Sequence, residues 1–125
     1  MAEQILIALD QGTTSSRAVA FDTSGRMLAS GSVEFPQIFP KPGWVEHDPR
    51  AILSSQIDAL RQAVRVGGIN VADIAAIGIT NQRETTLLWD RETGECVHNA
   101  IVWQCRRTAH YVDRLLSQGW GPVIR

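Results

Sequence analysis

An uninterrupted apolar run near the amino terminus ends in a carboxylate and continues into a glycine. The run Ile5–Leu9 has the length and composition of a strand covered on both faces, and Asp10 follows at its carboxyl end. Gly12 can adopt backbone angles closed to other residues, which lets the N–H groups after it turn toward an anion. Hydroxyl donors and a permanent positive charge come next: Thr13, Thr14, Ser15, Ser16 and Arg17. The segment predicts a strand followed by an anion-binding loop.

Glycine, threonine and serine also fill ordinary turns for conformational reasons alone, so a plain turn is the alternative interpretation. Two neighbours favour a binding site. Placing the Asp10 carboxylate at the end of a buried strand costs free energy unless the carboxylate binds a partner. Arg17, just past the hydroxyls, supplies the opposite charge. The pattern G-x-x-x-x-G-K-[ST] is absent, so an ATP site here has a different design.

Length and charge limit the classes of protein to consider. The 125 residues suit one domain, 44% hydrophobic content supports a core, and a net charge of −1 gives no basic surface for nucleic acid. The start MAEQILIALD lacks a positive region, and its apolar run is too short for a signal peptide or a membrane helix. We therefore expect a cytoplasmic protein without membrane insertion. Cys96 and Cys105 lack C-x-x-C spacing and are expected to be free thiols.

Two further strands and a helix follow the loop. Residues 18–22 and 27–35 read as strands joined by a tight turn, so three antiparallel strands open the fold. The proline-rich segment after them is irregular. Asp48 and Pro49 then begin a helix that ends before Gly67. Its apolar side chains recur at helical spacing and predict the face that packs on the sheet: Leu53, Ile57, Leu60 and Val64.

The second half of the chain echoes the first. Residues 74–80 are continuously apolar, as expected of an interior parallel strand after a crossover helix. A threonine-rich polar loop, a second strand and a turn come next, in the order seen after Leu9. The two polar loops should lie at matching ends of neighbouring strands, where α/β sheets bind ligands. A last helix is expected over residues 106–118.

Three side chains of the second half are candidates for a small polar ligand. Arg83 offers only donors and Glu84 only acceptors, so in a loop the two can converge on a hydroxyl, although a solvated charged turn is the alternative. Trp103 borders an apolar run and a polar stretch, which suits a pocket wall, although tryptophan is more often a core residue. Arg106 and Arg107 begin the last helix, where the dipole disfavours cations, so one of them needs a local partner.

Together, DQGTTSSR, ITNQRETT and VWQCRR resemble the N-terminal region of the FGGY carbohydrate kinase family, over essentially the whole chain. The resemblance implies an α/β fold of the ribonuclease H-like, actin and hexokinase type, with a mixed sheet, an antiparallel three-strand start and flanking helices. Family members often have a carboxylate two residues after the tryptophan. Cys105 stands there instead, which points toward the branch that phosphorylates glycerol.

The resemblance also implies roles. Asp10 would hold the Mg²⁺ of ATP through water, and the residues that would meet the phosphates are Gly12, Thr13, Thr14, Ser15 and Arg17. Arg83, Glu84 and Trp103 would line the glycerol pocket. Residues 1–125 would form part of the N-terminal kinase domain of a homo-oligomer. The general base and the C-terminal ATPase domain would lie beyond Arg125, so no catalytic residue falls in the chain and the chain alone should be inactive.

Three rival interpretations stay open at this point. Another FGGY enzyme could act on a different sugar or polyol. A non-enzymatic ATP-binding module of the actin type shares a similar phosphate loop, but it needs no polyol pocket. A ribonuclease H-like nuclease could use Asp10 for a metal, but it needs further clustered carboxylates, and the sequence offers no clear candidates.

Overall fold

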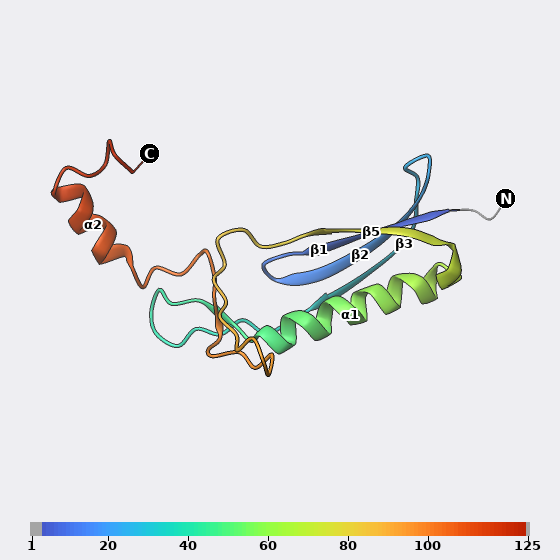
Figure 1. The fold of residues 1–125 in the computed structure, drawn as a ribbon, viewed down its shortest axis with the longest axis horizontal. Coiled ribbons are helices and arrows are strands. Elements are labelled where there is room, and N and C mark those ends of the chain that lie inside the picture. Colours follow the sequence, from blue (N-terminus) through green and yellow to red (C-terminus); the bar gives the residue numbers. More distant parts are fainter. Residues whose placement is uncertain (1–3, 125) are drawn as a thin grey trace.

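The computed structural model describes residues 4–124 and is built around one mixed sheet (Figure 1). The sheet has the strand order β3-β2-β1-β5, in which β5 runs parallel to β1 and the other neighbours are antiparallel. These strands are β1 Ile5–Gln11, β2 Ser15–Asp22, β3 Met27–Glu34 and β5 Ile74–Thr80. A short second sheet pairs β4 Glu46–His47 with β6 Ala100–Ile101. The antiparallel three-strand start is therefore confirmed.

Helix α1 (Pro49–Val66) has the limits that the sequence predicts, because the signals at both ends are local. The Asp48 side chain accepts a hydrogen bond from the backbone N–H of Arg50 at 2.9 Å and caps the first turn. Gly67 closes the last turn by donating its N–H to the carbonyl of Ala63 at 3.0 Å. The helix covers one face of the sheet (Figure 1).

The face that α1 buries differs from the predicted one. Ser55, Ala59 and Ala63 are the buried positions, whereas Leu53 is 63% exposed and Ile57 39% exposed. The cause is the close approach of α1 to β3. A Cβ on Gly31 would lie 2.2 Å from the carbonyl oxygen of Ala59, so only small side chains fit at this contact.

The hydrophobic core lies between the sheet and α1. One cluster consists of Ile5, Ile7, Ala20 and Ala29, with Leu9, Leu60, Ile69 and Ile74 packed against it. A second cluster consists of Ala18, Ala59 and Ala63, with Leu9, Val33 and Leu60 packed against it. The prediction of a β1 strand covered on both faces was wrong for residues 4–124. Leu6 is 41% exposed and Asp10 is exposed, because α1 covers a single face.

Strand β5 is parallel to β1, as predicted, but it is not an interior strand in the described part of the chain. It has a strand on one side only, and its side chains Ile77 and Ile79 are 51% and 74% exposed. The continuous apolar run reflects a strand that needs cover on both faces. Ile77 and Ile79 are in register with Ile7 and Leu9, on the face that α1 packs against, but α1 lies mainly over β2 and β3, so both faces of β5 are exposed in the described part of the chain.

The residues after β5 are less regular than the sequence echo suggests. In place of a second strand, single bridges join Thr86 to Ile101 and Trp89 to Cys96. A 3-10 turn, η1, spans Val71–Asp73, and helix α2 spans Ala109–Ser117, a shorter range than the predicted 106–118. Helix α2 projects away from the sheet (Figure 1) and buries none of its residues. No helix within residues 4–124 has the length and apolarity to span a bilayer.

Candidate functional site

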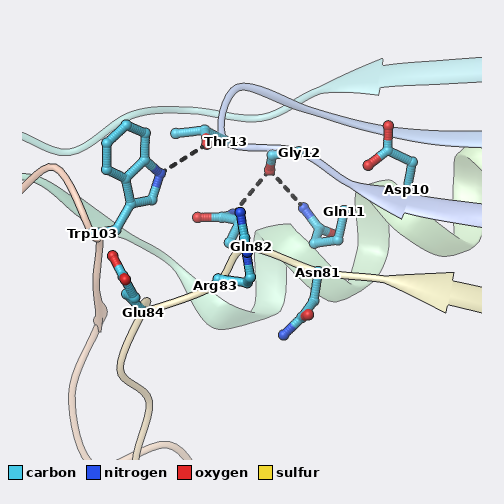
Figure 2. A pocket seen from close by; sticks show the side chains of 9 residues that line it. All are labelled: Asp10, Gln11, Gly12, Thr13, Asn81, Gln82, Arg83, Glu84 and Trp103. Atoms are coloured by element: carbon cyan, nitrogen blue, oxygen red, sulfur yellow. Dashed lines mark hydrogen bonds between the residues drawn. The ribbon is translucent and has the colours of Figure 1, made fainter.

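Two polar loops meet at one edge of the sheet, as the sequence echo predicts. Because β1 and β5 are parallel neighbours, their carboxyl ends lie side by side, and the loop after each strand extends from the same edge. The loops and one tryptophan enclose a pocket of about 470 Å³. Figure 2 shows the nine side chains that line it: Asp10, Gln11, Gly12, Thr13, Asn81, Gln82, Arg83, Glu84 and Trp103.

Gly12 makes the first loop tight, but not in the way the sequence suggests. Its φ is not in the left-handed region, so no unusual backbone angle is needed. Its N–H donates to the carbonyl of Ser15 at 3.0 Å, and a Cβ at this position would lie 2.7 Å from the same oxygen. Glycine is required here because of close backbone approach.

The structure brings only part of the predicted phosphate loop into the pocket. Asp10, Gly12 and Thr13 line it, whereas Thr14, Ser15 and Arg17 do not. The tight turn closed by Gly12 and Ser15 reverses the chain, so the later residues lie on the β2 side. Ser16 is fully buried and has a structural role, since its hydroxyl contacts that of Ser55 at 2.7 Å.

Asp10 and Arg17 nevertheless share one face of the sheet. They are direct cross-strand partners, and Thr80 is the partner of Asp10 on the other side. Directly opposed residues project to the same face. Asp10 and Arg17 are both exposed, on the face that α1 leaves open. The carboxylate and the guanidinium are thus available beside the loop rather than committed to the core.

Arg83 and Glu84 enter the pocket from the loop after β5. Both side chains are exposed, and neither forms an ion pair within the described residues. Glu84 has a φ of 67°, and no other described non-glycine residue has a positive φ. This conformation is unfavourable for a residue with a Cβ, and such residues cluster at binding sites. The two charges therefore converge on the pocket at some conformational cost.

Trp103 forms one end of the pocket and contacts the phosphate loop directly. Its indole Nε1 donates to the hydroxyl of Thr13 at 3.1 Å, and its backbone N–H points to the hydroxyl of Thr85 at 3.4 Å. The side chain is 51% exposed. Trp103 is a wall residue, not a core residue. In Figure 2, Trp103 and Glu84 lie at one end of the pocket and Asp10 at the other.

A buried ion pair holds the segment that carries Trp103. The Arg107 guanidinium lies 2.7 Å from the carboxylate of Glu46, whose other oxygen accepts from the amide of Asn99 at 3.0 Å. Arg107 also stacks on Trp44 with 4.0 Å to the ring centre. The hydrogen bonds that Arg107 and Asn99 donate to its carboxylate lower the pKa of Glu46. The prediction that one of the paired arginines needs a local partner is confirmed.

Sequence reasoning missed five polar side chains of the site region: Gln11, Gln37, His47, Asn81 and Gln82. His47 is fully buried, and burial lowers its pKa. Gln82 stands directly before Arg83, so its place after a continuously apolar strand was the available signal. Gln37 and His47 lie in the irregular proline-rich stretch, where no periodicity marks them. Cys96 and Cys105 are both free, as expected.

Comparison with known proteins decides the family. Residues 5–125 match the N-terminal domain of the FGGY family of carbohydrate kinases. The chain belongs to this family. It is 56% identical over its whole length to a glycerol kinase of Symbiobacterium thermophilum, and 59% identical to one of Caldanaerobacter subterraneus subsp. tengcongensis. In both cases the chain spans about a quarter (25%) of the relative.

Solved structures of FGGY kinases share the fold. Glycerol kinase of Plasmodium falciparum with ADP aligns with a TM-score of 0.79 at 32% identity, over 90% of this chain and 23% of that one. A ligand-bound xylulose kinase of Lactobacillus acidophilus aligns with a TM-score of 0.81 at 28% identity, over 97% of this chain and 24% of that one. The α/β, ribonuclease H-like fold expected from the sequence is confirmed.

Proposed function

We propose that this chain is the N-terminal part of a longer FGGY kinase that transfers the γ-phosphoryl group of ATP to glycerol and forms sn-glycerol 3-phosphate. One observation carries the proposal: a single pocket contains the phosphate-loop residues Gly12 and Thr13 together with Arg83, Glu84 and Trp103. Glycerol kinases that are more than half identical to the chain support the choice of acceptor. A cytoplasmic location and a homo-oligomer stay predictions.

The acceptor end of the pocket fits a small polyol. Glycerol has only three carbons, so apolar burial at about 25 cal/mol per Å² gives little affinity. Hydrogen bonds to charged groups contribute about 1.5 to 3 kcal/mol each. Arg83 donates to hydroxyl oxygens and Glu84 accepts from hydroxyl protons, while the exposed face of Trp103 covers the carbon skeleton. Analogues that lack a hydroxyl leave one of these charges unpaired and are rejected.

The other end of the pocket fits a phosphate chain. Thr13 offers a hydroxyl, and we assign Thr14, Ser15 and Arg17 to the phosphates as well, approached from the open face that Arg17 shares with Asp10. Phosphoryl transfer is accelerated mainly by positioning and by neutralising the charge of the transferring group. Gly12 and Thr13 position the group, and Arg17 contributes positive charge.

Asp10 fits a magnesium ion that is held largely by water and phosphate oxygens. It is an exposed carboxylate at the pocket edge, and no cluster of three or more potential ligands exists among residues 4–124. Magnesium bound to nucleotides commonly takes one or two protein carboxylates and keeps several waters. Bound there, the ion would offset the negative charge of the phosphates. We assign the general base to the part of the enzyme that this chain does not span.

The test is a coupled assay of the full-length enzyme with glycerol, xylulose, gluconate and dihydroxyacetone as acceptors. We expect glycerol to give the highest kcat/KM. Arg83→Ala should lower kcat/KM for glycerol by about 10- to 150-fold, the loss of one hydrogen bond from a charged group. Arg91→Ala, at an exposed turn position outside the pocket, is the matched control and should have no effect.

Three results would contradict the proposal. A higher kcat/KM for another acceptor would reassign the enzyme within the FGGY family. Turnover of ATP that does not depend on any polyol, and is unchanged by Arg83→Ala, would favour an actin-like module. Formation of glycerol 3-phosphate by residues 1–125 alone would show that the base lies inside this chain.

A further inference from the structure

The buried ring of His47 joins two glutamines from distant parts of the chain. His47 lies in β4, and its ring packs edge-on against Phe35 with 5.0 Å between centroids. Its Nε2 is 2.7 Å from Oε1 of Gln37. Its Nδ1 is 3.4 Å from Nε2 of Gln82, in the loop after β5. Both ring nitrogens are therefore occupied by amide side chains that approach the phosphate loop.

The hydrogen bonds of Gln37 determine which ring nitrogen carries the proton. The Gln37 amide nitrogen faces two backbone carbonyls, those of Thr13 at 3.2 Å and Phe35 at 3.3 Å. A carbonyl only accepts, so the NH₂ group must point there and the Gln37 oxygen must face His47. His47 consequently donates from Nε2 and accepts at Nδ1. This is the neutral ring, in agreement with the burial that lowers its pKa.

Gln82 extends the network to the acceptor loop. Its amide nitrogen donates to the carbonyl of Gly12 at 2.9 Å as well as facing His47. Its oxygen accepts from the hydroxyl of Thr85 at 3.1 Å, and the backbone N–H of Trp103 faces that hydroxyl. Every donor in this network therefore has an acceptor. The buried ring thus contacts both amides that donate to the carbonyls of Thr13 and Gly12, and Gln82 belongs to the loop that carries the acceptor-binding charges. The Gly12 carbonyl also accepts from the Gln11 amide at 3.2 Å.

We propose that His47 is a positioning residue for phosphoryl transfer, which fixes the phosphate loop relative to Arg83 and Glu84 through Gln37 and Gln82. The inference rests on the proposed function, since it gives a role within that reaction. The two amides hold consecutive carbonyls of the segment that bears the Thr13 hydroxyl. A displacement of about 1 Å between reacting groups can cost about 100-fold in rate, whereas one hydrogen bond contributes little to folding.

The deciding variant is Gln82→Met in the full-length enzyme. It keeps the length of the side chain but removes the bonds to Gly12, His47 and Thr85. We expect kcat to fall by about 10- to 100-fold, with the KM values for ATP and glycerol changed by less than about threefold. Gln62→Met is the matched control, because the half-buried Gln62 amide also bonds to the backbone, accepting from the N–H of Ser32 at 3.0 Å, but outside the pocket.

Two variants of the ring test its part in the network. His47→Asn can still present an acceptor oxygen to Gln82, whereas His47→Leu cannot. We expect His47→Asn to retain at least about fivefold more kcat than His47→Leu, a difference of the size that one hydrogen bond gives. If both ring variants fail to fold, Gln82→Met, whose side chain is only half-buried, decides the question.

Several outcomes would overturn the proposal. These are a Gln82→Met kcat within twofold of the unsubstituted value, a loss no larger than that of Gln62→Met, or a rise in KM without a loss of kcat. If the unsubstituted enzyme phosphorylates no polyol, the proposed function fails, and crystal structures of it and of Gln82→Met then decide the positioning role. We expect the Gly12–Thr13 peptide to shift relative to Glu84, and an unchanged backbone would refute the role.

Discussion

The indole nitrogen of Trp103 donates a hydrogen bond to the hydroxyl of Thr13 at 3.1 Å, across 90 positions of sequence. An indole N–H can only donate, so the Thr13 oxygen acts as the acceptor in this contact. The hydroxyl proton of Thr13 is then free to point toward another acceptor, such as a phosphate oxygen. Trp103, which forms a wall of the proposed glycerol pocket, thus leaves the Thr13 hydroxyl proton available for a phosphate oxygen.

Trp103→Phe tests this relationship, because it keeps a smaller aromatic wall and removes the donor. We expect kcat/KM for glycerol to fall by about two- to tenfold, in line with about 0.5 to 1.5 kcal/mol for one hydrogen bond. Trp120→Phe makes the same substitution at a similarly exposed indole, 49% against 51%, and should leave kinetics unchanged. Equal effects of the two substitutions would contradict a specific role for the Trp103 contact.

Local sequence signals were sufficient for much of the fold. The limits of α1 follow from Asp48 and Gly67, which satisfy the helix ends within a few residues. The meeting of the two polar loops could be predicted because parallel neighbouring strands end at the same edge of a sheet. In both cases one short segment, or a general rule of α/β sheets, contains all the necessary information.

Other features depend on partners that the sequence does not bring together. The buried face of α1 is decided by its approach to Gly31, so the smaller residue Ala59 is buried in place of Leu53. The network around His47 joins three separate segments and leaves no periodic pattern. Because of the tight turn at Gly12, three of the five residues expected to meet the phosphates lie outside the pocket, which composition alone could not show.

Glu84→Gly should make the protein more stable and less active. Relief of a left-handed φ is worth about 1 to 2 kcal/mol, against an entropic cost of about 0.5 to 1 kcal/mol for glycine. We therefore expect a higher midpoint of urea denaturation together with a loss of glycerol turnover. Glu84→Ala removes the same carboxylate but keeps the strained φ of 67°. A gain in stability for both variants would mean that backbone strain is not its source.

The Glu46–Arg107 ion pair predicts a pH dependence of stability on the acid side. Hydrogen bonds from Arg107 and Asn99 lower the pKa of Glu46 below its usual value of 4.5. The unfolded chain therefore takes up this proton at a higher pH than the folded one. The stabilisation is fully present above about pH 4.5 and is lost as the pH falls through the lower, folded pKa.

Glu46→Gln tests this dependence by urea denaturation at a series of pH values. Leaving Arg107 without its buried partner should cost about 3 to 5 kcal/mol at neutral pH, and the difference from the unsubstituted protein should shrink below pH 4.5. Glu34→Gln, the same change at an exposed position at the end of β3, is the control. A pH-independent difference between Glu46→Gln and the unsubstituted protein would show that the charge of Glu46 is not responsible.

Two glycine substitutions test whether α1 is held by its close approach to the sheet. At Gly31 a new Cβ would lie 2.2 Å from the carbonyl oxygen of Ala59 and 2.8 Å from Cβ of Gln62. Gly31→Ala should thus force the helix away and cost about 1 to 3 kcal/mol or more. At Gly78 in β5 no atom lies within 4 Å, so Gly78→Ala should be neutral or slightly stabilising. Equal urea midpoints for the two variants would mean that β3 and α1 separate without cost, and that the small residues of α1 are not what fixes the helix against the sheet.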